Sequence, residues 1–279
     1  MSLQLSQSCS FNASRMSSQH SPHQTDSGSD DEPKTDRATA HVALVFTHAA
    51  ELKILMGRLD RRRRYSDGEL RFTGGFFDES IRVAAVEAGS GFAAHRRATT
   101  VLIEEHKPTW VISAGFSSSL TEGVRAGDLS LATAICDTHG QQLKVECPIP
   151  ESKHSTLKTH LVTDSHPQTA DEKRQLAAAH DAGAVDTASL AVAQVCAEFE
   201  TRFISIRAIL DDAEEELPSA VIASLFEPAG STRGHPVSSW ISGLRKSPEM
   251  KAWTTRATTV SGRLDRFLTG VIRQLGKPD

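Results

Sequence analysis

Residues 185–216, VDTASLAVAQVCAEFETRFISIRAILDDAEEE, decide the fold class, because a helix pattern runs there directly into a strand pattern. Apolar residues recur at helical spacing over 190–199, and the run 203–209 is rich in isoleucine, as expected of a buried strand. Asp211 and Asp212 therefore end a core strand. Ligands of open α/β sheets bind at the carboxyl ends of the strands, so chemistry is expected here first.

The rest of the chain alternates short apolar runs with helical patterns, which is typical of a sheet covered by helices. We expect strands over 42–46, 70–73 paired with 82–86, 110–113, 128–134 and 161–163. We expect helices over 51–59, 93–105, 169–180 with Thr169 or Asp171 at the N-cap, after 216, and over 247–275 as one or two basic amphipathic helices, with a loop at 227–236. The pattern predicts one α/β domain over 40–279 with a mixed central sheet.

Residues 1–39 differ from the rest in composition. They are rich in serine, carry scattered charges and contain no long apolar run. Such a segment cannot bury enough apolar surface to offset the entropy that it would lose on ordering. We therefore predict a disordered tail over 1–39, followed by the α/β domain over 40–279.

Charge and hydropathy argue against two classes of partner. The formal net charge of −4 gives no electrostatic reason to bind nucleic acid. The arginine run 61–64 is expected to be a solvated face or turn, with a phosphate-binding patch as the alternative. No charged segment followed by an apolar one opens the chain, and no run reaches about 18 apolar residues, the length of a spanning helix. We predict a soluble, cytoplasmic protein without a membrane partner.

The four cysteines are Cys9, Cys136, Cys147 and Cys196. They form no CxxC pair and have no clustered histidine partners, so their spacing favours reduced thiols over a disulfide framework or a structural zinc site. We expect no metal site, and nothing in the sequence calls for a cofactor.

Four sequence blocks carry a resemblance to a known family. They are 41–52, HVALVFTHAAEL; 86–92, VEAGSGF; 107–128, KPTWVISAGFSSSLTEGVRAGD; and 185–216. In order and spacing they resemble the nucleoside phosphorylase and nucleosidase superfamily, most closely its methylthioadenosine/S-adenosylhomocysteine nucleosidases and hopanoid-associated phosphorylases. The resemblance implies a three-layer α/β/α fold with a mixed central sheet, cleavage of the N-glycosidic bond of an adenosine-like or related nucleoside, and a homodimer or larger homo-oligomer.

The resemblance assigns two carboxylates to the reaction, which needs a proton for the leaving base and a nucleophile for the sugar carbon. Aligning RAILDDAEEELP with the family motif makes Asp211, and not Asp212, the proton donor, and Glu51 falls at the water-positioning glutamate. Each has a structural alternative, because Asp is favoured as a helix cap and Glu in a first helical turn. His48, in the turn before Glu51, is a further candidate for ligand contact, with a solvated turn residue as the alternative.

The resemblance also implies a substrate pocket. Small residues are needed where the backbone approaches a ligand closely, and the turn at 89–91 meets that need between a strand and a helix. The expected substrate-binding residues are Gly89, Ser90, Gly91, Gly115, Phe116, Ser117, Ser118, Thr187 and Ala188. The expected partner is a small-molecule nucleoside, with phosphate left open as a second substrate.

Three departures from the family pattern alter this pocket. Ala188 replaces the glutamate that grips the ribose hydroxyls, Leu210 replaces a small polar residue, and Ser118 with Ser119 replaces a glycine pair. Loss of a two-bond charged grip would weaken transition-state binding by a factor of about a thousand or more. Leu210 cannot hydrogen-bond the neighbouring carboxyl group or the base, and side chains at 118 and 119 would intrude where the base of the family's substrates lies against bare backbone. The base pocket must therefore differ from that of the family.

Two alternatives to a hydrolytic enzyme follow. A relative that has lost catalysis would keep the fold and bind a nucleoside or another small molecule as a sensor or interaction protein. A phosphate-using enzyme would need cations, for which Arg96, Arg97 and Arg207 are candidates. Retention of both carboxylates favours an enzyme, whereas the missing glutamate at position 188 favours the binding protein.

Overall fold

The computed structural model describes residues 39–225 and 248–277. The chain divides into two units, Met1–Asp36 and Arg37–Asp279, and every described element belongs to the second. The tail predicted over 1–39 lies outside the described residues except for its last position, and the loop predicted at 227–236 lies entirely outside them.

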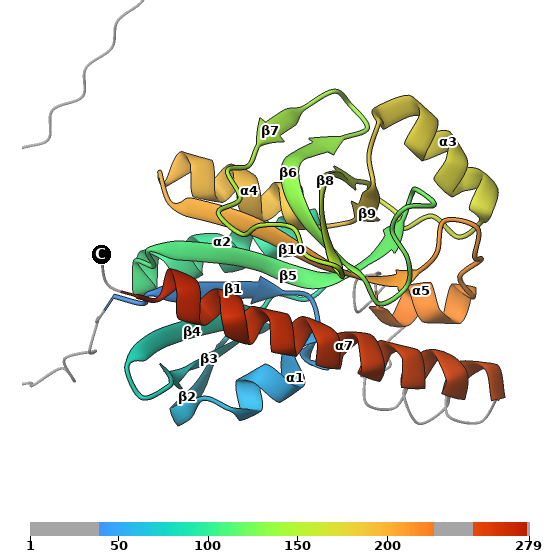
Figure 1. Cartoon of the computed structure of the whole chain (residues 1–279). Helices are drawn as coiled ribbons and strands as arrows, with labels where there is room; N and C mark the ends of the chain where they lie inside the picture. The colour runs from blue at the N-terminus through green and yellow to red at the C-terminus, as the bar shows by residue number, and fades with distance from the viewer. Residues whose placement is uncertain (1–38, 226–247, 278–279) are drawn as a thin grey trace, which may run out of the picture. The chain divides into compact units, whose positions relative to one another are not determined.

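Along the described chain, helices separate single strands and runs of three and four strands, so the predicted mixture of strands and helices is present (Figure 1). The strands are β1 (Val42–Phe46), β2 (Asp60–Asp67), β3 (Leu70–Phe77), β4 (Ile81–Glu87), β5 (Trp110–Ser119), β6 (Leu129–Asp137), β7 (Gln142–Lys144), β8 (Ser155–Val162), β9 (Ala184–Asp186) and β10 (Arg202–Asp211). The helices are α1 (Ala49–Gly57), α2 (Phe92–His106), α3 (Ala170–His180), α4 (Ser189–Glu198), α5 (Ser219–Leu225) and α7 (Pro248–Leu275).

The strands form one mixed sheet in the order β10–β6–β8–β9–β5–β1–β4–β3–β2, with β7 beside β6. Because β10 also pairs with β5, the strands from β10 to β5 close into a ring, and β1, β4, β3 and β2 extend from it. β5 is parallel to β1 and β10, whereas β6 is antiparallel to β10 and β9 is antiparallel to β5. The predicted mixed sheet is confirmed, and the ring is a feature that the sequence pattern does not predict.

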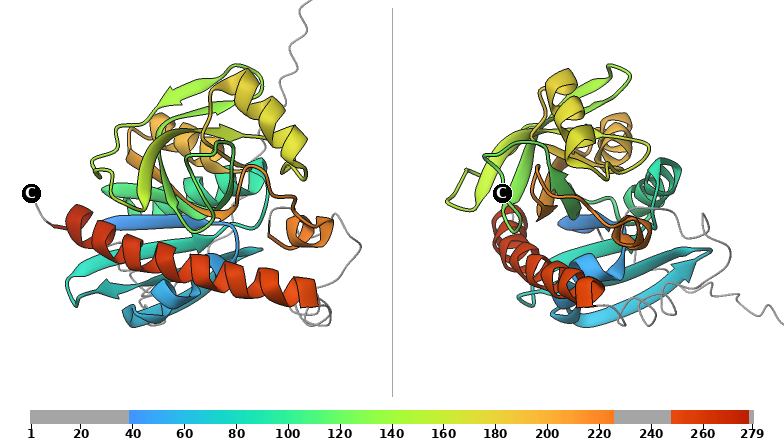
Figure 2. Two further views of the ribbon diagram at one scale, coloured as in Figure 1. Left: turned by 45° about the vertical axis from the view of Figure 1, so that its right-hand side comes forward. Right: turned by 90° about the vertical axis from the view of Figure 1, so that its right-hand side faces the viewer.

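Helices cover both faces of the sheet (Figures 1 and 2). On one face, Leu52 of α1 and Leu268 of α7 share a hydrophobic core with Leu44 of β1. On the other face, Leu102 of α2 packs in a second core with Val45 of the same strand, as the alternation of side chains along a strand requires. The three-layer α/β/α arrangement is therefore confirmed.

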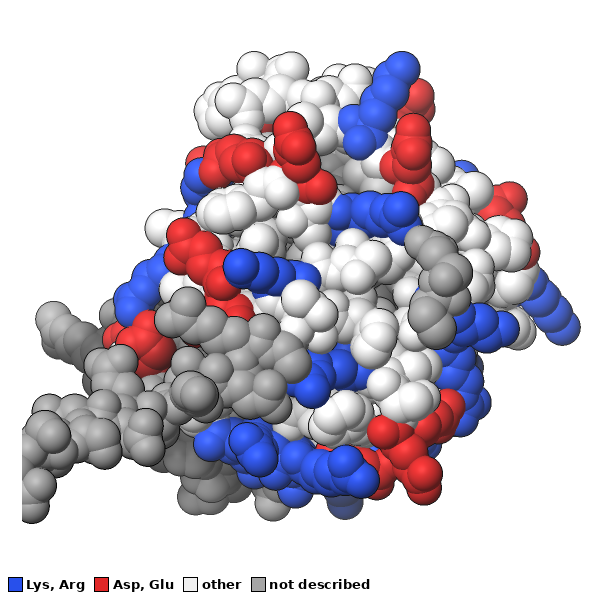
Figure 3. All heavy atoms as spheres, turned by 90° about the vertical axis from the view of Figure 1, so that its left-hand side faces the viewer, with Lys and Arg blue, Asp and Glu red and all other residues white. Residues whose placement is uncertain are grey.

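Most expected elements are present with shifted ends. The strand pair 70–73 and 82–86 corresponds to the antiparallel pair of β3 and β4, and α3 begins after its N-cap Thr169. A single helix, α7, occupies the region where one or two were expected. The arginine run 61–64 lies in β2, whose residues are all exposed, which agrees with a solvated face. Figure 3 shows basic side chains gathered along its lower border, at the level that β2 has in Figure 1.

Several strands run further than expected, among them β5 and β10. The strand predicted over 110–113 extends to Ser119 as β5, because β10 pairs beside it up to Asp211. A register shift between Ile209 and Asp211 marks the end of this pairing. Both strands consequently carry polar residues at their carboxyl ends, next to one another.

Within residues 39–225 and 248–277, no helix is long and apolar enough to cross a bilayer. Over the same ranges, no group of three or more His, Cys, Asp or Glu side chains could hold a metal ion. Cys136, Cys147 and Cys196 are free thiols.

Candidate active site

Three neighbouring parallel strands bring the predicted catalytic residues to one edge of the sheet. β1 lies parallel to β5, and β5 lies parallel to β10, so their carboxyl ends point the same way. Glu51 follows β1 in the first turn of α1, Ser118 lies near the end of β5, and Asp211 ends β10 in register with Ser118. This edge is where a parallel arrangement is expected to hold a ligand.

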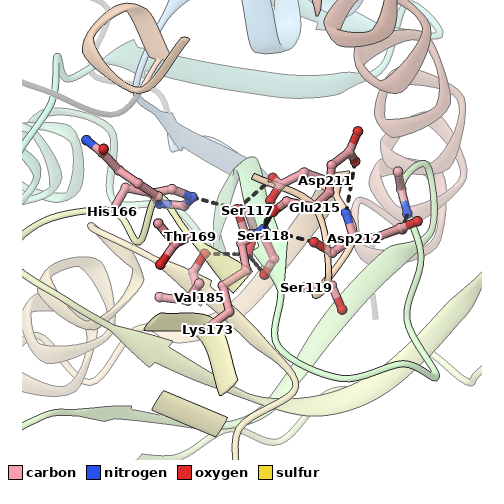
Figure 4. A network of polar contacts seen from close by, with 12 residues as sticks. Ser117, Ser118, Ser119, His166, Thr169, Lys173, Val185, Asp211, Asp212 and Glu215 are labelled. Atoms are coloured by element: carbon pink, nitrogen blue, oxygen red, sulfur yellow. Dashed lines mark hydrogen bonds and ion pairs between the residues drawn. The ribbon is translucent and has the colours of Figure 1, made fainter. Parts of the chain in front are cut away.

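Asp211 is fully buried, and both of its carboxylate oxygens have partners (Figure 4). Oδ1 accepts a hydrogen bond of 2.6 Å from Ser118 Oγ, and Oδ2 forms an ion pair with Lys173 Nζ. Ser118 Oγ also lies 2.7 Å from His166 Nε2. The suggestion that Asp211 caps the following helix is wrong, because that helix, α5, begins only at Ser219.

Lys173 reaches Asp211 from the first turns of α3 and has no exposed surface. Its Nζ also donates to the backbone carbonyl of Asp212 at 2.8 Å and to that of Glu215 at 2.6 Å. An ammonium group has three N–H donors, so these three acceptors satisfy it completely. The helix start that presents Lys173 is fixed by Thr169, whose hydroxyl accepts from the N–H of Glu172.

The environment shifts the titration of this cluster. Burial raises the pKa of Asp211 to about 6, against the opposing effects of the Lys173 ammonium and the Ser118 hydroxyl. Burial also lowers the pKa of His166 to about 3, so its ring is neutral at neutral pH. A buried carboxyl group that titrates near neutral pH is suited to act as a general acid.

Glu51 is buried on the other side of β5. Its Oε2 accepts from the backbone N–H groups of Thr47 at 2.8 Å and His48 at 3.1 Å, and its Oε1 accepts from the N–H of Phe116 at 2.9 Å. Burial raises the pKa of Glu51, while these N–H groups oppose the rise. Gly115 makes room for the carboxylate, because a Cβ there would lie 2.6 Å from Oε1.

A second buried ion pair lies beside Glu51. Arg207 Nε donates to Asp186 Oδ2 at 3.0 Å, and an Arg207 Nη donates to Ser113 Oγ at 2.7 Å. Asp186 Oδ1 also accepts from the N–H groups of Ala188 and Ser189, both at 2.7 Å, and thereby holds the start of α4. Burial alone would raise the pKa of Asp186, but the charge of Arg207 and these hydrogen bonds lower it to about 2.

The glycine turn joins β4 to α2 as the sequence predicts. Gly89 and Gly91 have φ values of 76° and 100°, a conformation that glycine adopts without strain. Between them, Ser90 Oγ lies 3.0 Å from His48 Nε2, and burial lowers the pKa of His48 to about 4. His48 is therefore a partly buried neighbour of the turn and not a solvated residue.

A cavity of about 100 Å³ adjoins this turn. It is lined by Gly91, Phe92, Asp137, Thr138, His139, Val162, Thr163, Asp164, Thr187 and Leu190. Ligand pockets of proteins typically hold about 300–1,000 Å³, so binding of a nucleoside here requires side chains or loops to move apart.

The three departures from the family pattern have different structural consequences. Ala188 is buried at the N-cap of α4, and Ser118 holds Asp211 directly. Ser119 Oγ donates to the carbonyl of Thr121 and stays clear of Asp211. Leu210 is fully buried in the core shared with α7, so it does not reshape the pocket as expected. The side chain of Leu210 lies on the face of β10 that packs against α7, away from the pocket.

Two of the arginines considered for phosphate lie elsewhere. Arg96 pairs with Glu198 at 2.8 Å and donates to Gln194, which links α2 to α4. The guanidinium of Arg97 lies beside Gly68 in the turn between β2 and β3, 3.2 Å from an ideal Cβ there. Of the three candidate arginines, Arg207 is the one that lies near the proposed catalytic carboxyl groups, and Asp186 neutralises its charge.

Comparisons with known proteins agree with this architecture. No protein-family model matches the chain. A 5′-methylthioadenosine/S-adenosylhomocysteine nucleosidase of Staphylococcus aureus (strain MRSA252) is 24% identical over 217 residues, covering 68% of this chain and 95% of the relative. The same enzyme of Neisseria meningitidis, solved with methylthio-immucillin-A, has a TM-score of 0.63 at 16% identity over 85% of this chain and 99% of that one. Futalosine hydrolase of Helicobacter pylori strain 26695 has a TM-score of 0.58 at 16% identity over 82% and 97%.

The sequence match spans nearly the whole length of the relative, and the solved structures share the fold. The chain is therefore similar in sequence to a 5′-methylthioadenosine/S-adenosylhomocysteine nucleosidase and shares its fold with solved structures of such nucleosidases and of futalosine hydrolase. This similarity agrees with the resemblance carried by the four sequence blocks.

Sequence reasoning missed two side chains at this site. His166 and Lys173 come from the segment 138–184, in which prolines and polar residues obscure any period. One signal was available for Lys173. It shares a helix face with Leu176 and Ala177, which pack on a small core, and a lysine on the apolar face of a helix calls for a buried partner.

Proposed function

We propose that the protein hydrolyses the N-glycosidic bond of an adenosine-like nucleoside. The observation that carries the proposal is a pair of buried carboxyl groups that both bind to the end of β5, with Glu51 of α1 bound to the N–H of Phe116 and Asp211 of β10 bound to the hydroxyl of Ser118. One carboxyl group of such a pair can protonate a leaving group while the other orients water.

The two groups take different parts in the reaction. Asp211 gives its proton to a ring nitrogen of the base while the C–N bond breaks and its electron pair moves to the base. Glu51 orients a water molecule, whose oxygen bonds to the sugar carbon while Glu51 receives its proton. The products are the free base and the free sugar.

Water suits this site better than phosphate does. Arg207 is the described candidate arginine beside Glu51, and it is already paired with Asp186 and Ser113. A phosphate ion next to the turn would approach the buried Glu51 carboxyl group and a neutral His48. We therefore favour hydrolysis over phosphorolysis.

The substrate side follows the assignments made from the sequence. We assign the sugar to the glycine turn and to Thr187 and Ala188, and the base to the segment from Gly115 to Ser118. Ala188 offers no charged partner to the sugar hydroxyls, so affinity must come from the other contacts. The resemblance to the superfamily also supports a homodimer in the cytoplasm. Light scattering on purified protein tests the homodimer, and cell fractionation tests the location.

A second candidate function is the binding of a nucleoside without turnover. Two observations favour it: both oxygens of Asp211 are already engaged, and the adjoining cavity is only about 100 Å³. A binding protein would need the pocket to open, but it would not need a free carboxyl group.

The test is incubation of the purified full chain with a panel of purine nucleosides, with and without phosphate, followed by chromatography for free base. Hydrolysis predicts base release that is independent of phosphate and absent from Asp211→Asn. Release that requires phosphate would contradict the choice of water. Binding detected by calorimetry without any base release would favour the second candidate.

A further inference from the structure

Lys173 and Asp211 form an ion pair in which neither side chain has exposed surface. The proposed reaction uses the carboxyl group of Asp211 but assigns no part to Lys173. Removing two charges from water costs several kcal/mol per ion, and a well-packed apolar pair is often at least as stable. Stability alone therefore does not account for a lysine at this position.

Glu215 is a further acid whose charge affects the pKa of Asp211, and another cation, Arg256, already binds it. Its carboxylate accepts two hydrogen bonds from Arg256 of α7, at 2.6 and 2.7 Å. Its backbone carbonyl accepts from Lys173. The Glu215 carboxylate is thus directed at α7 and is not a partner of Lys173.

Two other titratable groups lie close to Asp211. Asp212 turns its carboxylate to the N–H of Ala126, at 2.6 Å. His166 contacts Ser118 Oγ, which in turn donates to Asp211, and burial lowers the pKa of His166 so that its ring is neutral. Among the residues that the structure describes, Lys173 is therefore the cation in contact with the Asp211 carboxyl group.

We propose that Lys173 is a positioning residue that sets the pH range in which Asp211 carries its proton and stabilises the carboxylate that remains after the proton has left. The ammonium holds Oδ2, so Oδ1, on the Ser118 side, is the oxygen that exchanges the proton. The effect of Lys173 on the charge of Asp211 follows from the geometry alone. Its effect on turnover rests on the proposed function.

The direction of the effect is fixed by the sign of the charge. An opposite charge at this range typically lowers the pKa of a carboxyl group by about 1–3 units, so its removal raises that pKa by a similar amount. Asp211 would then keep its proton to higher pH. It would also release the proton less readily, because no ammonium would stabilise the carboxylate that forms.

The first test needs no substrate. Infrared difference titration follows the protonated carboxyl band of Asp211, which is assigned by its loss in Asp211→Asn. We expect Lys173→Met to raise the titration midpoint by at least one pH unit. Lys173→Gln, which keeps two N–H donors without the charge, should shift it in the same direction and serves if the first variant does not fold. An unchanged midpoint in whichever variants fold would overturn the proposal.

The second test is kinetic. For a nucleoside that the wild-type protein cleaves, Lys173→Met should move the alkaline limb of kcat/KM upward by at least one pH unit and lower the plateau at least tenfold. A structural role alone would lower the plateau and leave the limb in place, which would contradict the proposal. If no nucleoside is cleaved, the proposed function fails, while the infrared titration still decides on Lys173.

Arg174→Met is the matched control. Arg174 is the next residue of the same helix, is exposed, and pairs with Asp171 at 2.6 Å and with Glu214 at 3.7 Å. Loss of this surface cation should leave both the titration midpoint and the limb within about 0.2 pH units of the wild type, because exposed charges are screened. An equal shift in the control would assign the effect to overall charge and overturn the role of Lys173.

Discussion

At the residue scale, Asp211 connects the proposed reaction to the stability of the chain, because its proton-donating group is also half of a buried ion pair. Asp211→Asn should lower base release by about 10²–10⁴-fold, since an amide has no proton to give. The same change leaves the Lys173 ammonium without a charged partner. We expect the free energy of unfolding to fall by about 3–5 kcal/mol, as measured by urea denaturation.

Asp212→Asn is the comparison for this prediction. Asp212 bonds to a backbone N–H and has no contact with a buried cation through its side chain. Its replacement should leave most of the activity and cost less stability than Asp211→Asn. Equal effects of the two substitutions would remove Asp211 from its proposed role.

At Ala188, in contrast, a substitution is expected to raise activity. Ala188→Glu should raise kcat/KM for methylthioadenosine or a related ribonucleoside, because a carboxylate there can hold the sugar hydroxyls. It should also lower the melting temperature without ligand, since position 188 is buried and its N–H is already bound to Asp186. A folded variant without any gain on the panel would show that Ala188 does not limit activity.

At the scale of one element, β5 binds both proposed catalytic groups, and Gly115 is the point where it leaves room for the Glu51 carboxylate. Gly115→Ala places a Cβ 2.6 Å from Glu51 Oε1, so the carboxylate must leave the N–H of Phe116. We expect kcat to fall at least tenfold and stability to fall by about 1–3 kcal/mol. Gly74→Ala in β3 is the control, because its nearest contact is 4.0 Å away, and both quantities should change little.

Elements with a strong local pattern were predictable from the sequence. The apolar spacing over 190–199 predicts α4, and Thr169 with its glutamate three residues later predicts the start of α3. The three-residue strands β7 and β9 carry too little pattern to be recognised. The closed ring depends on pairs such as β5 with β9, which are distant in sequence and have no local signal.

The residues of the candidate site likewise divide into those with a local sequence signal and those without one. Asp211 and Glu51 were predictable because each lies at a fixed register in a recognisable block. Lys173 and His166 were not, because the contact of α3 with the end of β10 exists only in the folded chain. The burial of Leu210 was missed because alternation along β10 was not extended to its last residues.

At the scale of the whole molecule, buried histidines should control acid stability. Burial lowers the pKa values of His48, His95 and His160 to about 4 and that of His166 to about 3. The unfolded chain binds protons at these sites below about pH 6.5, and the folded chain does not, so stability is lost as pH falls from 6.5 towards 4.

Asp211 acts in the opposite direction, because its raised pKa of about 6 makes the folded chain bind a proton that the unfolded chain lacks between pH 4 and 6. The net difference is up to three protons, or about 4 kcal/mol per pH unit at most. Urea midpoints measured from pH 4.5 to 7 should rise steeply with pH. His160→Gln should flatten the slope and His139→Gln, at an exposed position, should not. A flat wild-type profile would contradict this account.

The ring of strands also determines where a second copy of the chain could attach by backbone pairing. Closure removes the free borders of the ring strands, whereas β2 pairs only with β3 within the described residues and leaves a border of unpaired N–H and C=O groups. The four arginines at 61–64 lie on that strand, and all of them are exposed. Their mutual repulsion reaches about 10 Å at 0.1 M salt but only about 3 Å at 1 M. We therefore expect the protein to stay dispersed in dilute salt. In concentrated salt the repulsion is screened, and β2 should then seed aggregation.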